Sequence, residues 1–182
     1  MMKKEKELLV AVASQKGGVG KSVFTVLLAS VLHYRKDVRV AVVDCDSPQH
    51  SIALMRERDM ESVMKNDDLK VSLYRQHERI RKPAYPVIKS DPEKGVEDLR
   101  RYMDEKGETF DIVLFDLPGT LRSEGVVYTV AAMDYIFVPL KADNIVMQSS
   151  LQFTKVLEEE LIAKGNCNLK GIRLFWNMVD RR

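Results

Sequence analysis

A short apolar run followed at once by a glycine-rich loop constrains this chain more than any other feature. The run covers residues 8–13 (LLVAVA), and the loop reads KGGVGKS from Lys16 to Ser22. Glycine has no Cβ, so consecutive backbone N–H groups in such a loop can turn toward one anion. A strand that enters a glycine loop, with a helix starting from it, is the layout of a phosphate-binding site. We therefore expect an α/β protein that binds a phosphate group in this loop.

The loop departs from the ordinary P-loop pattern at one position. That pattern, G-x-x-x-x-G-K-[ST], asks for glycine where this chain has Gln15. The sequence instead fits the variant K-G-G-x-G-K-[ST], in which Lys16 is an additional cation. We expect Lys21 to reach the β- and γ-phosphates and the hydroxyl of Ser22 to bind Mg²⁺. A second cation at such a site is worth about 10³–10⁵ in rate where cationic fingers are known.

With these residues the chain resembles the ParA/MinD family of deviant Walker ATPases, and most of all the ParA/Soj-type partition ATPases. That family segregates DNA or positions cell structures. The resemblance implies ATP and Mg²⁺ as cofactors, slow hydrolysis stimulated by a partner, and an ATP-dependent homodimer. It also implies that Lys16 is the signature lysine, which reaches across the dimer interface to the nucleotide of the other subunit.

The resemblance also identifies the residues that would hold the nucleotide. They are Gly17, Gly18, Val19, Gly20, Lys21, Ser22, Val23 and Asn177. Val23 stands where relatives carry a second hydroxyl residue that touches the α-phosphate, and the lost hydrogen bond is worth about 1–2 kcal/mol. Modest nucleotide affinity is therefore expected. Asn177 follows the last expected strand, where relatives use an asparagine to bond the adenine edge; an ordinary turn asparagine explains it nearly as well.

Three aspartates follow apolar strands and complete the expected site. Asp116 ends the run IVLF as a Walker B carboxylate does, and would hold Mg²⁺ through water opposite Ser22. Asp44 and Asp46 are two residues apart and share one face of an extended chain. Their segment, DCDSPQ, resembles the family's D-x-D-P-Q switch with one serine inserted. By that resemblance Asp46 positions the attacking water and Asp44 lies in the outer shell of the metal, and the reverse division stays open.

Strand and helix signals alternate along the chain. Apolar runs predict strands at residues 8–14, 38–43, 112–115, 135–138 and 172–176, and a short strand at 69–74. Helices are expected at residues 21–34, within 51–66, from an N-cap at Asp91 to Gly107, and from a cap at Asp143 or Asn144 to Gly165. Strands that are apolar throughout, with helices between them, imply a mostly parallel sheet covered on both faces. The predicted fold is a three-layer α/β P-loop NTPase, in which the glycine loop, the aspartates and Asn177 all lie at carboxyl ends of strands.

Length and composition narrow the remaining possibilities. The 182 residues suit one domain that spans residues 1–182. The net charge of +2 is too small to argue for nucleic acid by itself. Cys45 and Cys167 form no CxxC pair, so reduced thiols are expected rather than a disulfide or zinc site. The first apolar run is too short for a signal peptide, and no apolar stretch could span a membrane, so we expect a cytoplasmic protein with no membrane partner.

The leading functional hypothesis is a ParA-type ATPase that partitions plasmid, chromosome or mobile-element DNA. Its partners would be a second subunit, a ParB-like activator and non-specific DNA. One basic cluster either contacts DNA phosphates or is a solvated face; it consists of Arg75, Arg79, Arg81 and Lys82.

Other functions of the same fold remain alternatives. One is a MinD-like positioning regulator without DNA binding, and another is a ligase similar to dethiobiotin synthetase. An iron–sulfur carrier is disfavoured because neither cysteine has a second one at cluster-binding spacing. The chain also ends soon after Asn177, whereas relatives continue with further helices. Either it is truncated relative to them or their DNA-binding and base-enclosing functions are built differently here.

Overall fold

Six parallel strands form the centre of the molecule in the computed structural model, which describes residues 6–119, 124–163, 165 and 167–179. The strands are β1 (Leu8–Val12), β2 (Val40–Asp44), β3 (Val87–Lys89), β4 (Ile112–Asp116), β5 (Tyr135–Leu140) and β6 (Gly171–Trp176). Their order in the sheet is β3-β2-β4-β1-β5-β6, and every neighbouring pair is parallel. The predicted three-layer α/β fold is confirmed.

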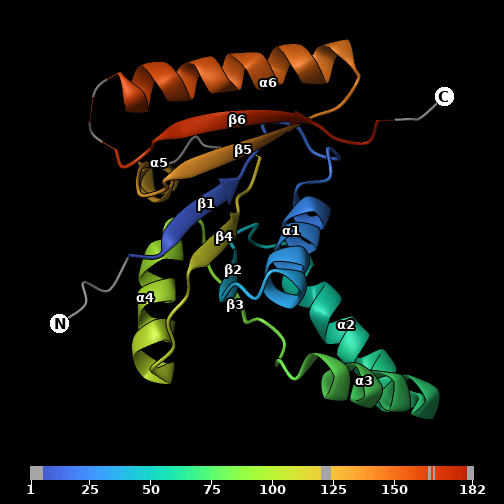
Figure 1. Cartoon of the computed structure of the whole chain (residues 1–182). Coiled ribbons are helices and arrows are strands. Elements are labelled where there is room, and N and C mark those ends of the chain that lie inside the picture. Colours follow the sequence, from blue (N-terminus) through green and yellow to red (C-terminus); the bar gives the residue numbers. More distant parts are fainter. Residues whose placement is uncertain (1–5, 120–123, 164, 166, 180–182) are drawn as a thin grey trace.

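Helices cover both faces of this sheet (Figure 1). They are α1 (Lys21–Arg35), α2 (Ser51–Lys65), α3 (Asp67–Ile80), α4 (Gly95–Lys106), α5 (Glu124–Ala131) and α6 (Asn144–Leu157), the last continued by the π-helical turn η1 (Glu158–Ile162). One core cluster packs α4, α5 and α6 on one face of the sheet. A second cluster packs α1 and α2 on the other face. No described helix is long and apolar enough to cross a membrane.

The central strands are buried because their side chains meet a helix layer on each side. All five residues of β2 are buried, as are four of the five in β1 and in β4. Along β1, Leu9 and Ala11 lie in one core cluster and Val10 in the other. This alternation explains why these strands are apolar throughout rather than apolar at every second position.

The prediction of a short strand at residues 69–74 is wrong, because these residues lie within α3. The side chain of Asn66 accepts a hydrogen bond from the N–H of Leu69 at 3.1 Å and so caps the helix. No residue of α3 is buried, and the helix projects away from the sheet beside α2 (Figure 1). An exposed helix needs no apolar stripe for burial, so the few apolar residues of α3 do not follow a helical pattern that separates them from a strand.

The structure also has a strand in the segment that holds Pro83, Pro86 and Pro92, where none was expected. This strand, β3, has only three residues, too few for a sequence pattern. Helix α4 begins at Gly95 rather than just after Asp91; Lys94 is its N-cap residue, and Asp91 accepts the N–H of Lys94 through its backbone carbonyl at 3.0 Å. Of the two caps expected for α6, Asp143 and Asn144, the structure has Asp143, whose Oδ1 accepts from the N–H groups of Ile145 and Val146 at 2.9 and 3.0 Å.

Candidate functional site

Three neighbouring strands end at the same edge of the sheet, and the glycine loop starts there. In the strand register Asp44 lies opposite Asp116, and Asp116 lies opposite Val12. The chain runs from Val12 into the loop, so the two aspartates predicted from separate segments lie beside it. The structure thus brings together the loop and the carboxylates that sequence reasoning assigned to one site.

The glycine loop leaves the N-terminus of α1 open to an anion. Gly20 is the N-cap residue of α1, with a left-handed φ of 81° that favours glycine. No side chain of the described residues caps this helix, and its first turn holds no acidic residue. The space beside Gly17 and Gly18, where a Cβ would lie, is open to beyond 4 Å. Free N–H groups and the positive end of the helix dipole therefore face a space that suits a phosphate.

Ser22 and Asp116 are in direct contact at the base of the loop. The hydroxyl of Ser22 donates to Oδ2 of Asp116 at 2.5 Å. The other oxygen, Oδ1, is buried and has no hydrogen-bond partner among the described residues. Burial raises the pKa of Asp116 to about 7; the Ser22 hydroxyl and the charge of Lys21 oppose this, whereas Asp44 and Asp46 add to it. A buried carboxylate with a free oxygen beside a hydroxyl fits a divalent cation, since oxygen donors are what Mg²⁺ prefers.

An Asp116→Asn variant is expected to be more stable than the unaltered protein when no metal is present. The pKa of Asp116 in the folded state is raised above its ordinary value, so ionisation opposes folding. The resulting loss of unfolding free energy is absent below about pH 4 and grows as the pH rises to about 7. It reaches at most about 4 kcal/mol. We expect the variant to gain about 1–3 kcal/mol at about pH 8, since the asparagine oxygen can still accept from Ser22 but its NH₂ group needs a partner.

Urea unfolding with EDTA at several pH values measures this difference. The gain in unfolding free energy should disappear as the pH falls to about 4, where Asp116 is protonated in both states. A gain that is absent at about pH 8, or equal at all pH values, would show that the buried charge is not the cause.

Asp44 is fully buried and bonds to the start of α2. Its Oδ2 accepts from the N–H groups of Ile52 and Ala53, both at 3.0 Å, and its Oδ1 accepts from the N–H of Asp46 at 3.4 Å. These contacts satisfy backbone N–H groups in the first turn of α2 that have no partner within the helix. Asp44 therefore links the switch segment, residues 44–49, to the start of α2. The half-buried Asp46 has no such partner for its side chain among the described contacts, and its backbone carbonyl accepts the N–H of His50 at 2.8 Å.

Asn177 lies against the glycine loop from the end of β6. Its Nδ2 donates to the backbone carbonyl of Val19 at 2.8 Å, and its backbone N–H donates to the carbonyl of Leu140 at 2.7 Å. A Cβ on Gly20 would come within 2.6 Å of the same Nδ2, so a larger residue at that position would displace the Asn177 side chain. The contact between Asn177 and the loop was not predicted. The expected bond to adenine remains a prediction.

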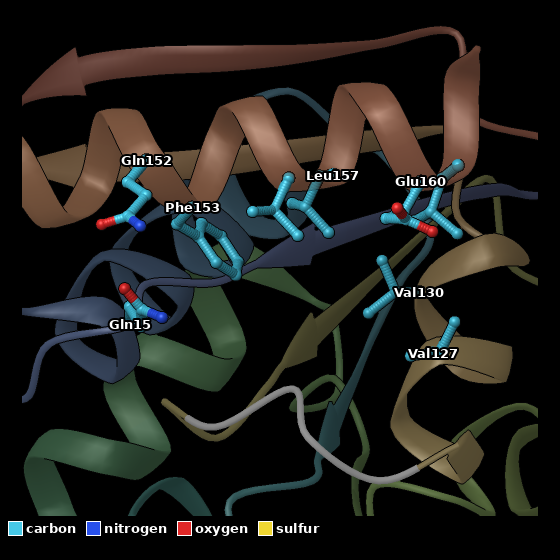
Figure 2. Close-up of a pocket in the computed structure, with 9 residues that line it drawn as sticks. Gln15, Val127, Val130, Gln152, Phe153, Leu157 and Glu160 are labelled. Carbon is cyan, nitrogen blue, oxygen red and sulfur yellow. The ribbon is translucent and has the colours of Figure 1, made fainter.

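Gln15, which occupies the place of the first P-loop glycine, contacts α6. Its Oε1 accepts from the hydroxyl of Ser149 at 2.9 Å. Beyond it lies a cavity of about 400 Å³ between α5 and α6. Figure 2 shows the side chains of Gln15 and Gln152 directed toward each other at one end, while Phe153 points from α6 toward the cavity. Sequence reasoning missed this contact, since nothing local links residues 134 positions apart.

The other predicted residues of the loop differ in their exposure. Lys16 is exposed at the lip, Val19 is buried beneath the loop, and Lys21 is half-buried at the start of α1. Val23 is 61% exposed on the first turn of α1. The basic cluster is separate from this site: its arginines lie on or just after α3, and Lys82 pairs with Asp37 at 2.9 Å.

Comparison with known proteins gives a family match and a set of similar structures. The family model described as ATPase MipZ matches residues 8–149. No curated protein matches the chain. A plasmid partition protein from Borrelia burgdorferi is 20% identical, with 98% of this chain and 81% of that chain covered and a TM-score of 0.67.

Two further solved structures share the fold. A putative plasmid partition protein from Borrelia burgdorferi, bound to AMPPNP, is 21% identical, with 98% of this chain and 78% of that chain covered and a TM-score of 0.65. A chain of the MinC:MinD cell division protein complex of Aquifex aeolicus is 16% identical, with 95% of this chain and 69% of that chain covered and a TM-score of 0.63. At these identities the likeness shows the fold.

Proposed function

This chain belongs to the MipZ ATPase family, whose fold it shares with ParA- and MinD-type proteins, and from that premise we propose that it is an ATP-driven molecular switch. ATP would bind with Mg²⁺ at the loop of residues 16–22. Two subunits would join while ATP is bound and separate after hydrolysis. The biological task would be partition of plasmid, chromosomal or mobile-element DNA.

The contact between Ser22 and Asp116 carries this proposal. It places a hydroxyl and a buried carboxylate 2.5 Å apart, next to an uncapped helix N-terminus, and leaves Oδ1 of Asp116 without a partner among the described residues. Ser22 and Asp116 would hold Mg²⁺, the serine directly and the aspartate through water. When bound, the cation neutralises charge on the β- and γ-phosphates.

The positions of the other site residues support the roles proposed for them. The loop N–H groups would cradle the phosphates and Lys21 would reach the β- and γ-phosphates from the start of α1. Asp46, which lies beyond the end of β2, would orient the attacking water. Lys16 is exposed at the lip of the loop, where it is free to approach a nucleotide held by a second subunit. Asn177 would bond the adenine edge after releasing Val19.

Calorimetric titration with ATP tests the core of this proposal. Binding is expected with Mg²⁺ present and weaker with EDTA. A Lys21→Ala variant should bind ATP about 10–100-fold less tightly, because a hydrogen bond to a charged group is worth about 1.5–3 kcal/mol. A Lys36→Ala variant is the matched control, since Lys36 is exposed at the other end of α1. Absence of ATP binding by the folded protein would refute the proposal.

Sedimentation with ATP and DNA then separates the proposed tasks. A partition ATPase should dimerise with ATP and, as a dimer, bind duplex DNA of unrelated sequence with an affinity that falls steeply as salt rises. A dimer that forms with ATP but ignores DNA would favour a MinD-like positioning regulator. Substitution of Arg75 and Arg79 by Ala shows whether the exposed arginines of α3 contribute to DNA binding.

A further inference from the structure

Gln15 gives the glycine loop an attachment that an ordinary P-loop lacks. In the ordinary pattern this position is glycine, which has no side chain. Here the Oε1 atom of Gln15 accepts a hydrogen bond from the hydroxyl of Ser149, which lies on α6, at 2.9 Å. Figure 2 shows the side chain of Gln15 directed from the loop toward α6. The departure from the P-loop pattern therefore joins the start of the loop to a helix that covers one face of the sheet.

Helix α6 is a firm support for this attachment. Its first N–H groups are capped by Asp143. Phe153 and Leu157 are buried in the core cluster that packs α6 on the sheet. Groups on a helix that is fixed by its buried face are held more precisely than groups on a loop. The half-buried Ser149 therefore presents its hydroxyl to the loop from a well-defined position.

Backbone contacts hold the same segment from another side. A Cβ on Gly119 would come within 3.3 Å of the carbonyl oxygen of Ser14 and 3.4 Å of that of Gln15, so the turn after β4 packs closely on them. The N–H of Lys16 donates to Oγ of the buried Ser14 at 3.3 Å. Residues 17 and 18 are glycines, and the space beside each is open. The position of Lys16 therefore depends on the residues before it more than on the glycines after it.

We propose that Gln15 is a positioning residue for ATP hydrolysis, because its bond to Ser149 holds the backbone from which Lys16 extends toward the phosphates. This inference rests on the proposed function, which assigns Lys16 to a nucleotide held by a second subunit. The side chain of Lys16 is exposed and has many rotamers, so the direction of its ammonium depends on how firmly its backbone is held. Misplacement of a reacting group by about 1 Å can cost about 10²-fold in rate.

Single-turnover hydrolysis tests the role of the bond. A neutral hydrogen bond is worth about 2–10-fold in a rate, so Gln15→Ala and Ser149→Ala should each hydrolyse ATP about 3–10-fold more slowly. Calorimetry should find ATP bound as tightly as by the unaltered protein. The double variant should be no slower than either single one, since each removes the same bond. Ser149→Thr keeps the hydroxyl and should restore the rate. Gln148→Ala is the matched control, since Gln148 is exposed beside Ser149 on α6.

A Lys16→Ala background separates action through the lysine from a general disturbance of the loop. If Gln15 acts by holding Lys16, adding Gln15→Ala to Lys16→Ala should cause no further loss of rate. A further loss of about 3–10-fold in that background would show that Gln15 acts by another route. Weaker ATP binding by Gln15→Ala would show a defect of the whole loop. Either result would overturn the inference.

A spin label at position 16 tests the attachment without ATP. In a Cys167→Ser background the label is placed on Lys16→Cys, and Cys45 is buried and should not react. The spectrum should show a more mobile label when Gln15→Ala or Ser149→Ala is added, and no change with Gln148→Ala. Equal mobility in all variants would overturn the inference while leaving the proposed function intact. A protein that binds no ATP would instead refute the proposed function, and with it any role of Gln15 in hydrolysis.

Discussion

A Lys16→Ala variant is expected to bind ATP nearly as tightly as the unaltered protein and to hydrolyse it about 10³-fold more slowly. Lys16 is exposed at the lip of the loop, and none of the ion pairs among the described residues includes it. Its loss should therefore leave the fold and the cradle intact. Cationic fingers that reach a phosphate from outside the cradle are worth about 10³–10⁵ in rate. Single-turnover release of labelled phosphate, together with calorimetric binding of ATP, measures both quantities.

Mixing two inactive variants distinguishes action across the interface from action within one subunit. The Lys16→Ala variant keeps the phosphate-binding loop and Lys21. The Lys21→Ala variant keeps Lys16 but binds ATP poorly. If Lys16 acts on the other subunit, the mixture should form mixed dimers. In them the Lys16→Ala subunit holds ATP, and Lys16 of the Lys21→Ala subunit reaches that ATP, so hydrolysis recovers in part. If the mixture stays as inactive as its components, Lys16 does not act across the interface. Lys36→Ala should hydrolyse ATP normally in the same assay.

The sequence was sufficient for the parts of the fold that are buried on both faces. Strands β1, β2, β4 and β5 are recognisable because a central parallel strand has helices on each side and so is apolar on both faces, with Asp44 and Asp116 only at the carboxyl ends of β2 and β4. The same rule gave no guidance for α3, which has no buried residue. Nor could it reveal β3, which has three residues in a segment rich in proline.

The site divides in a similar way. Ser22 and Asp116 each follow an apolar strand in a recognisable motif, so their meeting was predictable from strand order at the carboxyl edge of the sheet. The contacts from Asn177 to Val19 and from Ser149 to Gln15 were not predictable. They join segments more than 130 residues apart through side-chain amides and a hydroxyl, and no local pattern specifies such a pair. The hydrogen bonds from Asp44 to α2 were not predicted, because the resemblance to the D-x-D-P-Q switch assigns that carboxylate to the outer shell of the metal.

An Asp46→Ala variant is expected to bind ATP and to dimerise with it, yet to hydrolyse it about 10²–10⁴-fold more slowly, the usual contribution of a positioned general base. The structure favours Asp46 over Asp44 for the attacking water because the Asp44 carboxylate is already bonded to the start of α2. Sedimentation with ATP and single-turnover phosphate release should therefore report a long-lived dimer that accumulates because ATP is not cleaved.

The Asp44→Asn variant is the matched comparison and should fail in a different way. Its side-chain NH₂ group would replace one acceptor for the N–H groups of Ile52 and Ala53 or for that of Asp46. An unmet buried hydrogen bond costs about 1–3 kcal/mol, so urea unfolding without nucleotide should show a loss of stability of that size, with Asp46→Ala close to the unaltered protein. If Asp44→Asn instead keeps its stability and loses hydrolysis while Asp46→Ala hydrolyses ATP normally, the two aspartates have the opposite roles, and the bonds to α2 do not determine which of them orients water.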